Sequence, residues 1–371
     1  MRHPRLVPFA VLSALLLAPA CTAQAAYRFS GFRAKPPIHR YGSLAATPSG
    51  LAPAQIKAAY HLPQEGGHGT IAIIDAYDAS TIEHDLSVFD AAFGLTECTK
   101  KNGCLEVKKM SARMARNSGW ALETALDVEW AHAIAPQAKI LLIEAATPSG
   151  KNLLAAIDEA RKRTDVVAVS MSWGGGEFQD ETSLDAHFSS PHDAVFFASS
   201  GDNGAGVSWP AVSPRVVAVG GTTLRIAKSS GAVTETAWSG SGGGVSLYET
   251  QPEYQKSYDV KKSNGRRAVP DVSYDADPQT GYAVYHAAIG AKKGWYVLGG
   301  TSAGAPQWAA IRALGLSASN DRFYGDKDSA ANGAYFRDIK SGANGDCLYF
   351  CEARRRYDEV TGLGSPLTVD F

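Results

Sequence analysis

Ser302 stands in the run Gly299-Gly-Thr-Ser-Ala-Gly-Ala-Pro306, between a stretch typical of a strand and a stretch typical of a helix. Backbone N–H groups at the start of a helix can stabilise a developing oxyanion, so a serine there is well placed as a nucleophile. Serine is also a favoured helix N-cap, which is the alternative role. A nucleophilic serine needs a second side chain to take its proton.

Two carboxylates elsewhere in the chain are candidates for that base. Glu123 and Asp127 lie four residues apart in a predicted helix between Gly119 and Pro136, so both side chains share one face. Like charges at this spacing repel in a buried helix, which raises at least one pKa. A solvated acidic face is the alternative, but the surrounding alanines, leucines and tryptophans favour burial. Such a pair is expected to work best in acid.

Histidine, the usual base for a catalytic serine, lacks the required context here. None of the nine histidines lies in a His-Gly-Thr-His run on a predicted helix. Glu129 and His132 are three residues apart, and we expect them to pair with each other. A histidine-dependent serine hydrolase is therefore not indicated.

A further candidate follows a predicted strand. Asp202 lies in the run Ser199-Ser-Gly-Asp-Asn-Gly204. A protonated Asp202 could donate a hydrogen bond to an oxyanion beside the amide of Ser302. The alternative is a structural turn, which Asp-Asn-Gly also favours.

Short β-branched runs alternate with helical patterns along the chain. Strands are predicted at 70–76, 139–145, 166–173, 194–200 and 216–221, and helices at 80–93, 119–134, 151–163 and 302–316. The alternation predicts an α/β fold, a doubly wound and mostly parallel sheet with helices on both faces. Chemistry gathers at the carboxyl ends of such strands, so polar residues at these ends indicate one cleft.

The N-terminus has the pattern of an export signal. Two arginines precede an apolar run that ends at Ala20, and Ala23-Gln-Ala25 fits a small-residue cleavage site. We therefore expect a signal peptide at 1–25 and an extended leader at 26–50. The apolar run is too short for a stable membrane span, and Cys21 is a poorer match to a lipoprotein acceptor.

The charge balance does not favour a nucleic-acid partner. The chain has 36 basic and 37 acidic residues and no long basic stretch. An extracellular or periplasmic monomer is the expected state.

Apart from Cys21, the chain has four cysteines, which lie in two pairs close in sequence, Cys98 with Cys104 and Cys347 with Cys351. An even count in an exported chain indicates two local disulfides. Zinc is the alternative, but neither pair is C-x-x-C and no histidine stands near either pair in the sequence.

Several motifs occur in a fixed order. Two of them are Gly-Thr-Ser-Ala-x-x-Pro at Ser302 and Glu-x-x-x-Asp at Glu123. Six more are Ser170–Gly175, Ser199–Asp202, Val219–Thr222, Val269–Ser273, Asp275–Pro278 and Thr361–Pro366. Together they resemble the sedolisins, the serine-carboxyl peptidases of the subtilisin-like clan. The resemblance covers residues 45–371.

This resemblance implies a subtilisin-like fold and a role for each site residue. Ser302 would be the nucleophile that forms an acyl-enzyme, Glu123 the general base and acid, Asp127 the residue that orients Glu123, and Asp202 the oxyanion donor. Asp75 would support the carboxylate pair. The substrate cleft would be lined by Ser172, Trp173, Gly174 and Gly175.

The resemblance also implies one structural calcium ion near the C-terminus. Asp338 and Asp358 match its carboxylates, and Ile339 matches a backbone carbonyl ligand. Sedolisins usually have Gly-Pro-Gly where this chain has three arginines, so the carbonyls of Arg354 and Arg356 would have to serve.

Residues 51–371 are thus expected to form one peptidase domain that cleaves peptides or unfolded proteins in acid. The alternative is a catalytically silent peptide-binding or scaffold protein on the same fold. Both an endopeptidase and a tripeptidyl-peptidase are compatible with these motifs. Many sedolisins carry a long folded pro-region, whereas a leader of about two dozen residues is too short for a domain.

Overall fold

The computed structural model describes residues 29–287, 292–325 and 333–371. The predicted signal peptide, including Cys21, lies outside these residues. Within them, no helix is both long enough and apolar enough to cross a membrane.

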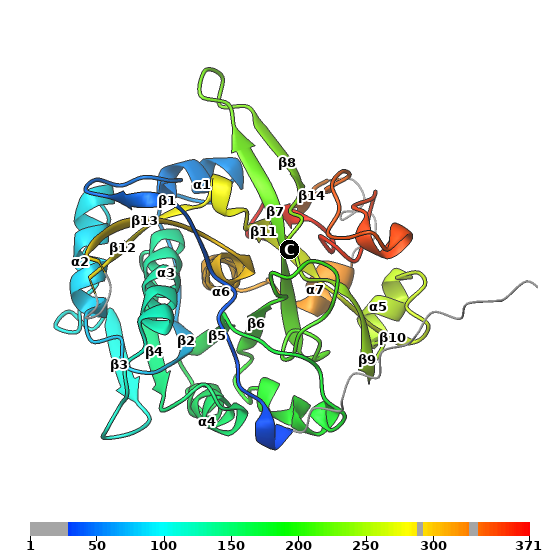
Figure 1. Cartoon of the computed structure of the whole chain (residues 1–371), viewed down its shortest axis with the longest axis horizontal. Helices are drawn as coiled ribbons and strands as arrows, with labels where there is room; N and C mark the ends of the chain where they lie inside the picture. Colours follow the sequence, from blue (N-terminus) through cyan, green and yellow to red (C-terminus); the bar gives the residue numbers. More distant parts are fainter. Residues whose placement is uncertain (1–28, 288–291, 326–332) are drawn as a thin grey trace, which may run out of the picture.

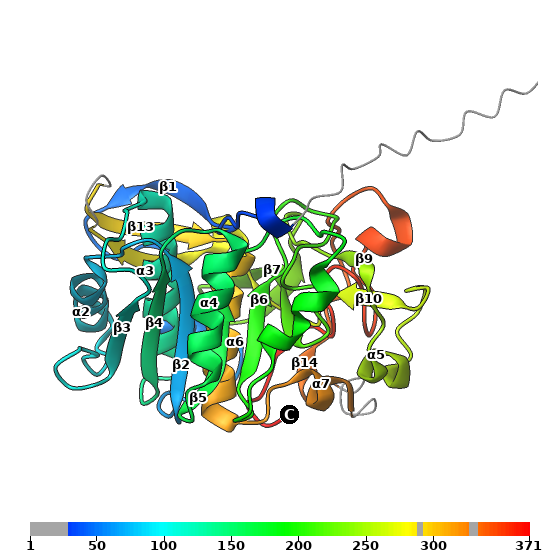
Figure 2. The same ribbon diagram turned by 90° about the horizontal axis from the view of Figure 1, so that it is seen from below.

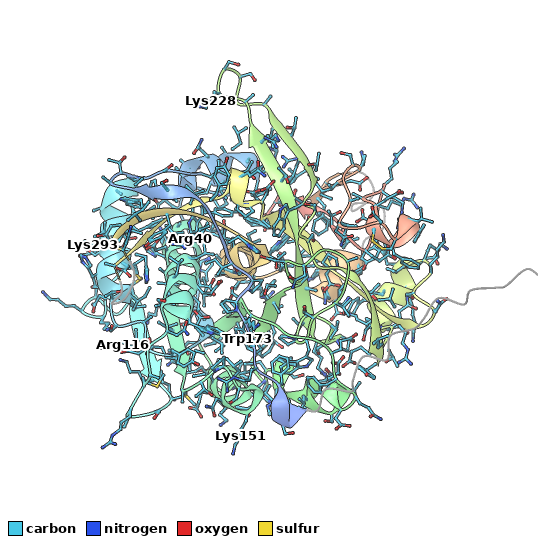
Figure 3. The ribbon with its side chains drawn as sticks, viewed as in Figure 1. Arg40, Arg116, Lys151, Trp173, Lys228 and Lys293 are labelled. Atoms are coloured by element: carbon cyan, nitrogen blue, oxygen red, sulfur yellow. A yellow bond between two sulfur atoms is a disulfide. The ribbon has the colours of Figure 1, made fainter. Side chains whose placement is uncertain are left out.

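An eight-stranded sheet forms the centre of the molecule, and seven of its strands follow the order β11-β7-β6-β5-β2-β4-β3 (Figure 1). Neighbours along this path are parallel, and β8 pairs antiparallel with β7. The hairpin of β7 and β8 projects from the body, with Lys228 near its tip (Figure 3). The strands are β2 (Thr70–Ala76), β3 (Leu105–Lys109), β4 (Lys139–Ala145), β5 (Val166–Met171), β6 (Val195–Ser199), β7 (Val216–Ile226), β8 (Val233–Ala237) and β11 (Val272–Asp275).

Alternate side chains of these strands pack on opposite faces of the sheet. In β2, Ile71 and Ile73 join the core with α3 and α6, whereas Ala72 and Ile74 join the core with α4 (Figure 2). Because both faces are covered, the central strands β2, β4, β5 and β6 are apolar along most of their length. The helices are α2 (Ile82–Phe93), α3 (Ser118–Ile134), α4 (Gly150–Arg161) and α6 (Gly304–Gly315). The predicted doubly wound α/β fold is confirmed.

A second, antiparallel sheet lies next to α2 and α3. In it β13 (Gly294–Gly299) pairs with both β1 (His39–Ala45) and β12 (Tyr282–His286). The strand that leads to Ser302 is β13, so it lies outside the parallel sheet that carries the other strand ends of the site. The leader contributes β1 to this sheet through its antiparallel pairing with β13.

The remaining elements are short and surround this core. Both expected disulfides are present, Cys98–Cys104 and Cys347–Cys351. The elements are α1 (Pro53–Ala59), β9 (Gly244–Thr250), α5 (Glu253–Tyr258), β10 (Arg266–Val269), α7 (Asn320–Gly325), β14 (Phe336–Arg337) and β15 (Ser365–Pro366).

Two polar side chains of α3 have partners that the sequence did not predict. Glu129 Oε2 accepts a hydrogen bond from Tyr285 N at 3.0 Å. His132 Nε2 lies 2.9 Å from Thr96 O and 3.5 Å from Asp90 Oδ1. The expected pairing of Glu129 with His132 is wrong, because each side chain faces a different neighbouring element.

His132 also lies beside the Cys98–Cys104 disulfide, with its ring nitrogen and both sulfurs within 4.8 Å of one another. The sequence did not indicate this neighbour, because His132 is distant from both cysteines along the chain. Zinc binds cysteine as thiolate, and in this structure both sulfurs are bonded to each other.

One buried ion pair fixes the start of β11. Arg267 and Asp271 are both fully buried, and Arg267 Nη1 donates to Asp271 Oδ1 at 2.7 Å. The same carboxylate accepts hydrogen bonds from Tyr324 Oη and from Ala218 N, both at 2.8 Å. This network joins β7, β10 and α7 around the Val-Pro-Asp-Val-Ser motif.

We predict that Asp271→Ala lowers the free energy of unfolding by about 3–5 kcal/mol, because it leaves the Arg267 charge buried and unpaired. Denaturant unfolding at neutral pH measures this loss. Asp321→Ala, an exposed position in α7, is the control and should cost less than about 0.5 kcal/mol. Equal losses in the two variants would contradict the role of the pair.

Candidate active site

The side chains predicted to do chemistry come together on the carboxyl side of the sheet. They are Asp75 near the end of β2, Glu123 and Asp127 on α3, Ser172 after β5, Asp202 after β6, and Ser302 in the 3-10 turn Thr301–Ala303 that precedes α6. Ser172 Oγ donates to the backbone oxygen of Ser302 at 3.0 Å, which ties the end of β5 to the serine turn.

The carboxylate pair is buried in α3. Asn117 caps the helix by accepting hydrogen bonds from Gly119 N and Trp120 N, and every residue from Glu123 to Ile134 is buried. Both carboxyls are fully buried, with the hydroxyl of Ser302 next to Glu123 and that of Ser172 next to Asp127. An ionised carboxylate is costly in such a place, so the pair retains protons at pH values where exposed carboxyls are ionised.

Burial raises the pKa of Glu123 well above its usual range, and the negative charge of Asp75 adds to it, while Ser302 and Asp127 oppose the rise. Burial also raises the pKa of Asp127, with the charges of Asp75 and Glu123 adding. For Asp75, burial raises the pKa to about 7, Thr124 opposes, and repulsion from Glu144 adds. Three acidic groups therefore share one dry site and cannot all ionise together.

Ser302 does not cap a helix through its side chain. Its hydroxyl instead donates a hydrogen bond of 2.8 Å to the backbone oxygen of Pro37, in the leader. A peptide carbonyl thus already lies against the candidate nucleophile. This contact favours the nucleophile over the N-cap interpretation.

Asp202 lies near that carbonyl, since both border Gly300. Its Oδ1 accepts hydrogen bonds from Thr301 N at 2.8 Å and Thr301 Oγ1 at 2.7 Å, and its Oδ2 lies 3.1 Å from Nε2 of His39. Burial raises the pKa of Asp202, and the contacts with His39 and Thr301 oppose the rise. Gly300 between them has φ of +126°, and a Cβ there would lie 2.1 Å from Pro37 O and 2.5 Å from Asp202 Oδ2.

The leader occupies the cleft in extended form, which the sequence analysis did not foresee. Lys35 and Gly174 exchange two backbone hydrogen bonds, of 3.0 and 3.1 Å. Ala34 N donates to Pro148 O at 2.8 Å. Beyond Ile38 the chain continues as β1 against β13. The prolines of this segment predict an extended chain, but its pairing partners are distant in sequence and give no local signal.

The four residues expected to line the cleft do not all do so. Gly174 and Gly175 border the hollow beside the leader. The side chain of Trp173 is fully buried, and its indole Nε1 donates to Ile74 O at 2.7 Å, in the interior (Figure 3). The expectation that Trp173 lines the cleft is therefore corrected. Trp173 follows β5, and alternate side chains of that strand pack into the core.

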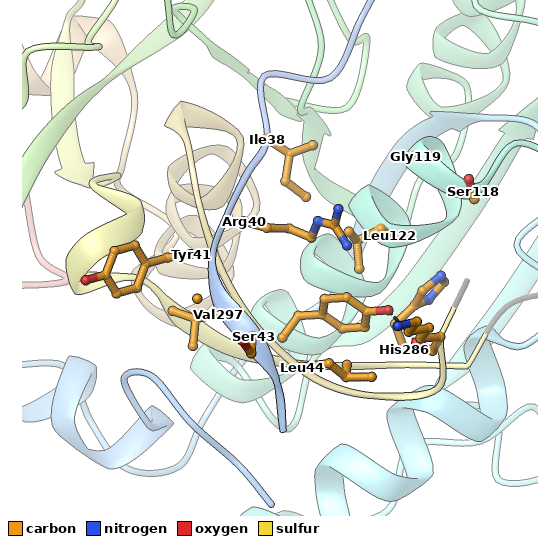
Figure 4. Close-up of a pocket in the computed structure, with 13 residues that line it drawn as sticks. Ile38, Arg40, Tyr41, Ser43, Leu44, Ser118, Gly119, Leu122, His286 and Val297 are labelled. Carbon is orange, nitrogen blue, oxygen red and sulfur yellow. Dashed lines mark hydrogen bonds between the residues drawn. The ribbon is translucent and has the colours of Figure 1, made fainter. Parts of the chain in front are cut away.

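On the carboxyl side of Pro37, the leader borders a cavity of about 760 Å³ (Figure 4). Leu122 of α3 and Val297 of β13 are among its walls. Arg40 of the leader extends into the same space, with its guanidinium 5.8 Å from the ring centre of Tyr296. The cleft therefore has room for side chains on both sides of the serine.

The residues expected to bind calcium lie in one C-terminal loop. Arg356 N donates to Asp338 Oδ1 at 3.0 Å, and Arg354 N donates to Asp358 Oδ2 at 2.9 Å. Ile339 is buried next to them.

Comparisons with known proteins indicate the family of the chain. The sequence profile of the Subtilase family matches residues 112–331. Sedolisin of Pseudomonas sp. (strain 101) is 28% identical over 339 positions, covering 80% of this chain, and kumamolisin of Bacillus sp. (strain MN-32) is 31% identical over 381 positions, covering 88%. The chain spans 56% and 64% of the length of these relatives. The structure of Pseudomonas sedolisin (serine-carboxyl proteinase), complexed with two molecules of pseudo-iodotyrostatin, superposes with a TM-score of 0.73 at 27% identity, covering 86% of this chain and 96% of the other.

The buried acidic site makes a prediction about stability. Because the folded-state pKa of Asp75 is raised from 3.8 to about 7, its proton stabilises the fold at low pH, and this contribution is lost as the pH rises through about 7. The free energy of unfolding should fall between about pH 5 and about pH 8, and Asp75→Asn should reduce that fall by about 1 kcal/mol or more.

Denaturant unfolding at both pH values measures the effect. Asp180→Asn, at an exposed position, is the matched control and should leave the fall unchanged. An equal fall in the wild type and in Asp75→Asn would contradict the raised pKa.

Proposed function

Because the chain belongs to the subtilase family and, within it, to the sedolisins, we propose that it is a serine-carboxyl endopeptidase that works in acid. The observation that carries the proposal is the contact of Ser302 Oγ with a peptide carbonyl, next to the buried carboxyl pair of Glu123 and Asp127. The substrate would be an extended peptide or an unfolded protein.

In the proposed reaction, Ser302 Oγ attacks the carbonyl carbon of the bound peptide and Glu123 accepts the proton of the hydroxyl. Asp127 orients Glu123 and shares its proton, and Asp75 supports the pair. Glu123 then gives the proton to the leaving amine, and water hydrolyses the acyl-enzyme by the reverse sequence. A desolvated carboxylate is a stronger base than an exposed one, which is why burial matters for this step.

Asp202 would stabilise the oxyanion. Its side chain borders Gly300, as Pro37 O does, and its pKa is raised by burial; both facts support this role, since only a protonated carboxyl can donate the hydrogen bond. In the present arrangement Oδ2 of Asp202 faces His39, so His39 must leave before Asp202 can donate. Acid favours the departure of His39 and the donation by Asp202. It protonates the Asp202 carboxylate, which then no longer attracts the His39 imidazolium.

We further propose that the protein is exported and acts outside the cytoplasm. Two disulfides in a chain with an N-terminal export pattern support this. Residues 51–371 would be the peptidase domain, with residues 26–50 as a leader.

We expect cleavage of an unfolded protein substrate to be fastest in acid, within a scan from about pH 3 to about pH 8. Ser302→Ala should lower the rate at least about 1,000-fold, because the nucleophile is lost. Ser183→Ala, at an exposed serine, is the control and should keep full activity. Activity that survives in Ser302→Ala, or that peaks at neutral pH, would refute the mechanism.

A structural calcium ion is also proposed for the C-terminal loop. Asp338, Asp358 and the carbonyls of Ile339, Arg354 and Arg356 would be its ligands, and an ion there would brace the loop. The fit is supported by the surroundings of Arg354, whose guanidinium pairs with Glu359 at 3.0 Å and lies 3.5 Å from the ring centre of Tyr349. Its charge is thus already compensated.

Millimolar calcium should raise the Tm of the protein and magnesium should not, because calcium accepts more oxygen ligands, in less regular geometry, than magnesium does. Asp338→Asn should abolish the calcium effect, and Asp346→Asn, an exposed position close by, should not. A Tm that does not change with calcium would exclude the site.

A further inference from the structure

The leader lies across Ser302 in the register of a substrate. Pro37 O accepts the serine hydrogen bond, so the bond from Pro37 to Ile38 is the one aligned for attack. Lys35 is the third residue before this bond. Its backbone N–H and C=O both form hydrogen bonds with the backbone of Gly174. The chain continues without a break to the sixth residue, Phe32. The cleft is therefore open well beyond the third residue.

Phe32 fills an aromatic hollow at the far end of this cleft. Only 4% of Phe32 is exposed, and its ring meets Trp209 edge-on with centres 4.8 Å apart. Phe178 lies 5.8 Å away on another side. The backbone of Gly175 forms the floor, because a Cβ on this glycine would lie 2.6 Å from the Phe32 ring. Edge-to-face geometry of this kind adds to the burial of the ring.

The walls of the hollow are held by the peptidase domain itself. Gly175 and Trp209 exchange two backbone hydrogen bonds, of 3.0 and 2.9 Å. The hollow also holds the bound chain by its backbone, since Gly150 N donates to Phe32 O at 3.1 Å. Main-chain hydrogen bonds between the walls reduce the ordering needed when a ring enters, which favours binding.

We propose that this hollow is a recognition site for an aromatic side chain six residues before the cleaved bond, and that Phe32 is its first occupant. This inference rests on the proposed peptidase function and names its substrates: internal segments of extended chains with an aromatic residue at that position. Release of the leader would expose Phe178 and Trp209 in an open groove, and such an apolar patch on a protein surface is typical of a binding site. A large anchor in a fitted pocket contributes much of the binding free energy of a peptide.

Binding to an inactive protein tests the site without any hydrolysis. The protein carries Ser302→Ala to prevent cleavage, and Phe29→Ala with Phe32→Ala to vacate the hollow, because the rings of both leader residues lie against Phe178 and Trp209. Its ligands are two dye-labelled peptides with the sequence of residues 30–41, one natural and one with alanine in place of Phe32. Fluorescence anisotropy in acid should show the natural peptide binding about 10-fold to 100-fold more tightly, as expected for burying one phenylalanine side chain.

Closing the hollow supplies the control. Adding Gly175→Ala should bring the two affinities close together, because the new Cβ occupies the floor. Gly176→Ala is the matched change, since a Cβ there meets nothing within 4 Å, and it should keep the preference. Equal affinities in the open protein, no binding of either peptide, or a preference that survives Gly175→Ala would each overturn the proposal. A clear preference in a protein whose wild type cleaves nothing would keep the recognition site and refute only the peptidase function.

Discussion

The burial of acidic side chains next to a serine is the constraint on which the rest of this structure depends. Glu123 and Asp127 can serve as base and partner only where water is excluded, and α3 provides this by being buried from Glu123 to Ile134. The parallel sheet covers one side of the helix, and β12 of the second sheet approaches from another. Ser302 then reaches the pair from a 3-10 turn that links the second sheet to α6.

The leader is an extended segment that lies across the proposed active site. Its main chain pairs with Gly174 on one side of Ser302 and with β13 on the other, so recognition uses backbone hydrogen bonds that any extended peptide can make. Selectivity must then come from side chains, and the hollow around Phe32 is a place where one can act. His39 of the leader pairs with Asp202, so occupancy of the cleft is linked to the ionisation of the proposed oxyanion donor.

Much of the fold could be predicted from the sequence, because it is written in local patterns. The observed β2 and β4 have the predicted residues, since short β-branched runs between polar turns have few alternatives. The buried Glu123–Asp127 pair followed from helical spacing. The pairing of the leader with Gly174 and the neighbours of His132 could not be predicted, because both depend on contacts between residues far apart in the chain. Trp173 was misjudged because proximity to a strand end does not say which face a side chain takes.

The central claim is that Ser302 is the nucleophile and that Asp202 stabilises the oxyanion. A crystal structure with a peptide aldehyde at acid pH tests it most directly, because an aldehyde forms a tetrahedral adduct with an activated hydroxyl. We expect a covalent bond from Ser302 Oγ to the aldehyde carbon, the adduct oxygen within hydrogen-bond distance of Asp202, and His39 displaced. An adduct on another side chain, or a bound aldehyde with Asp202 turned away, would contradict it.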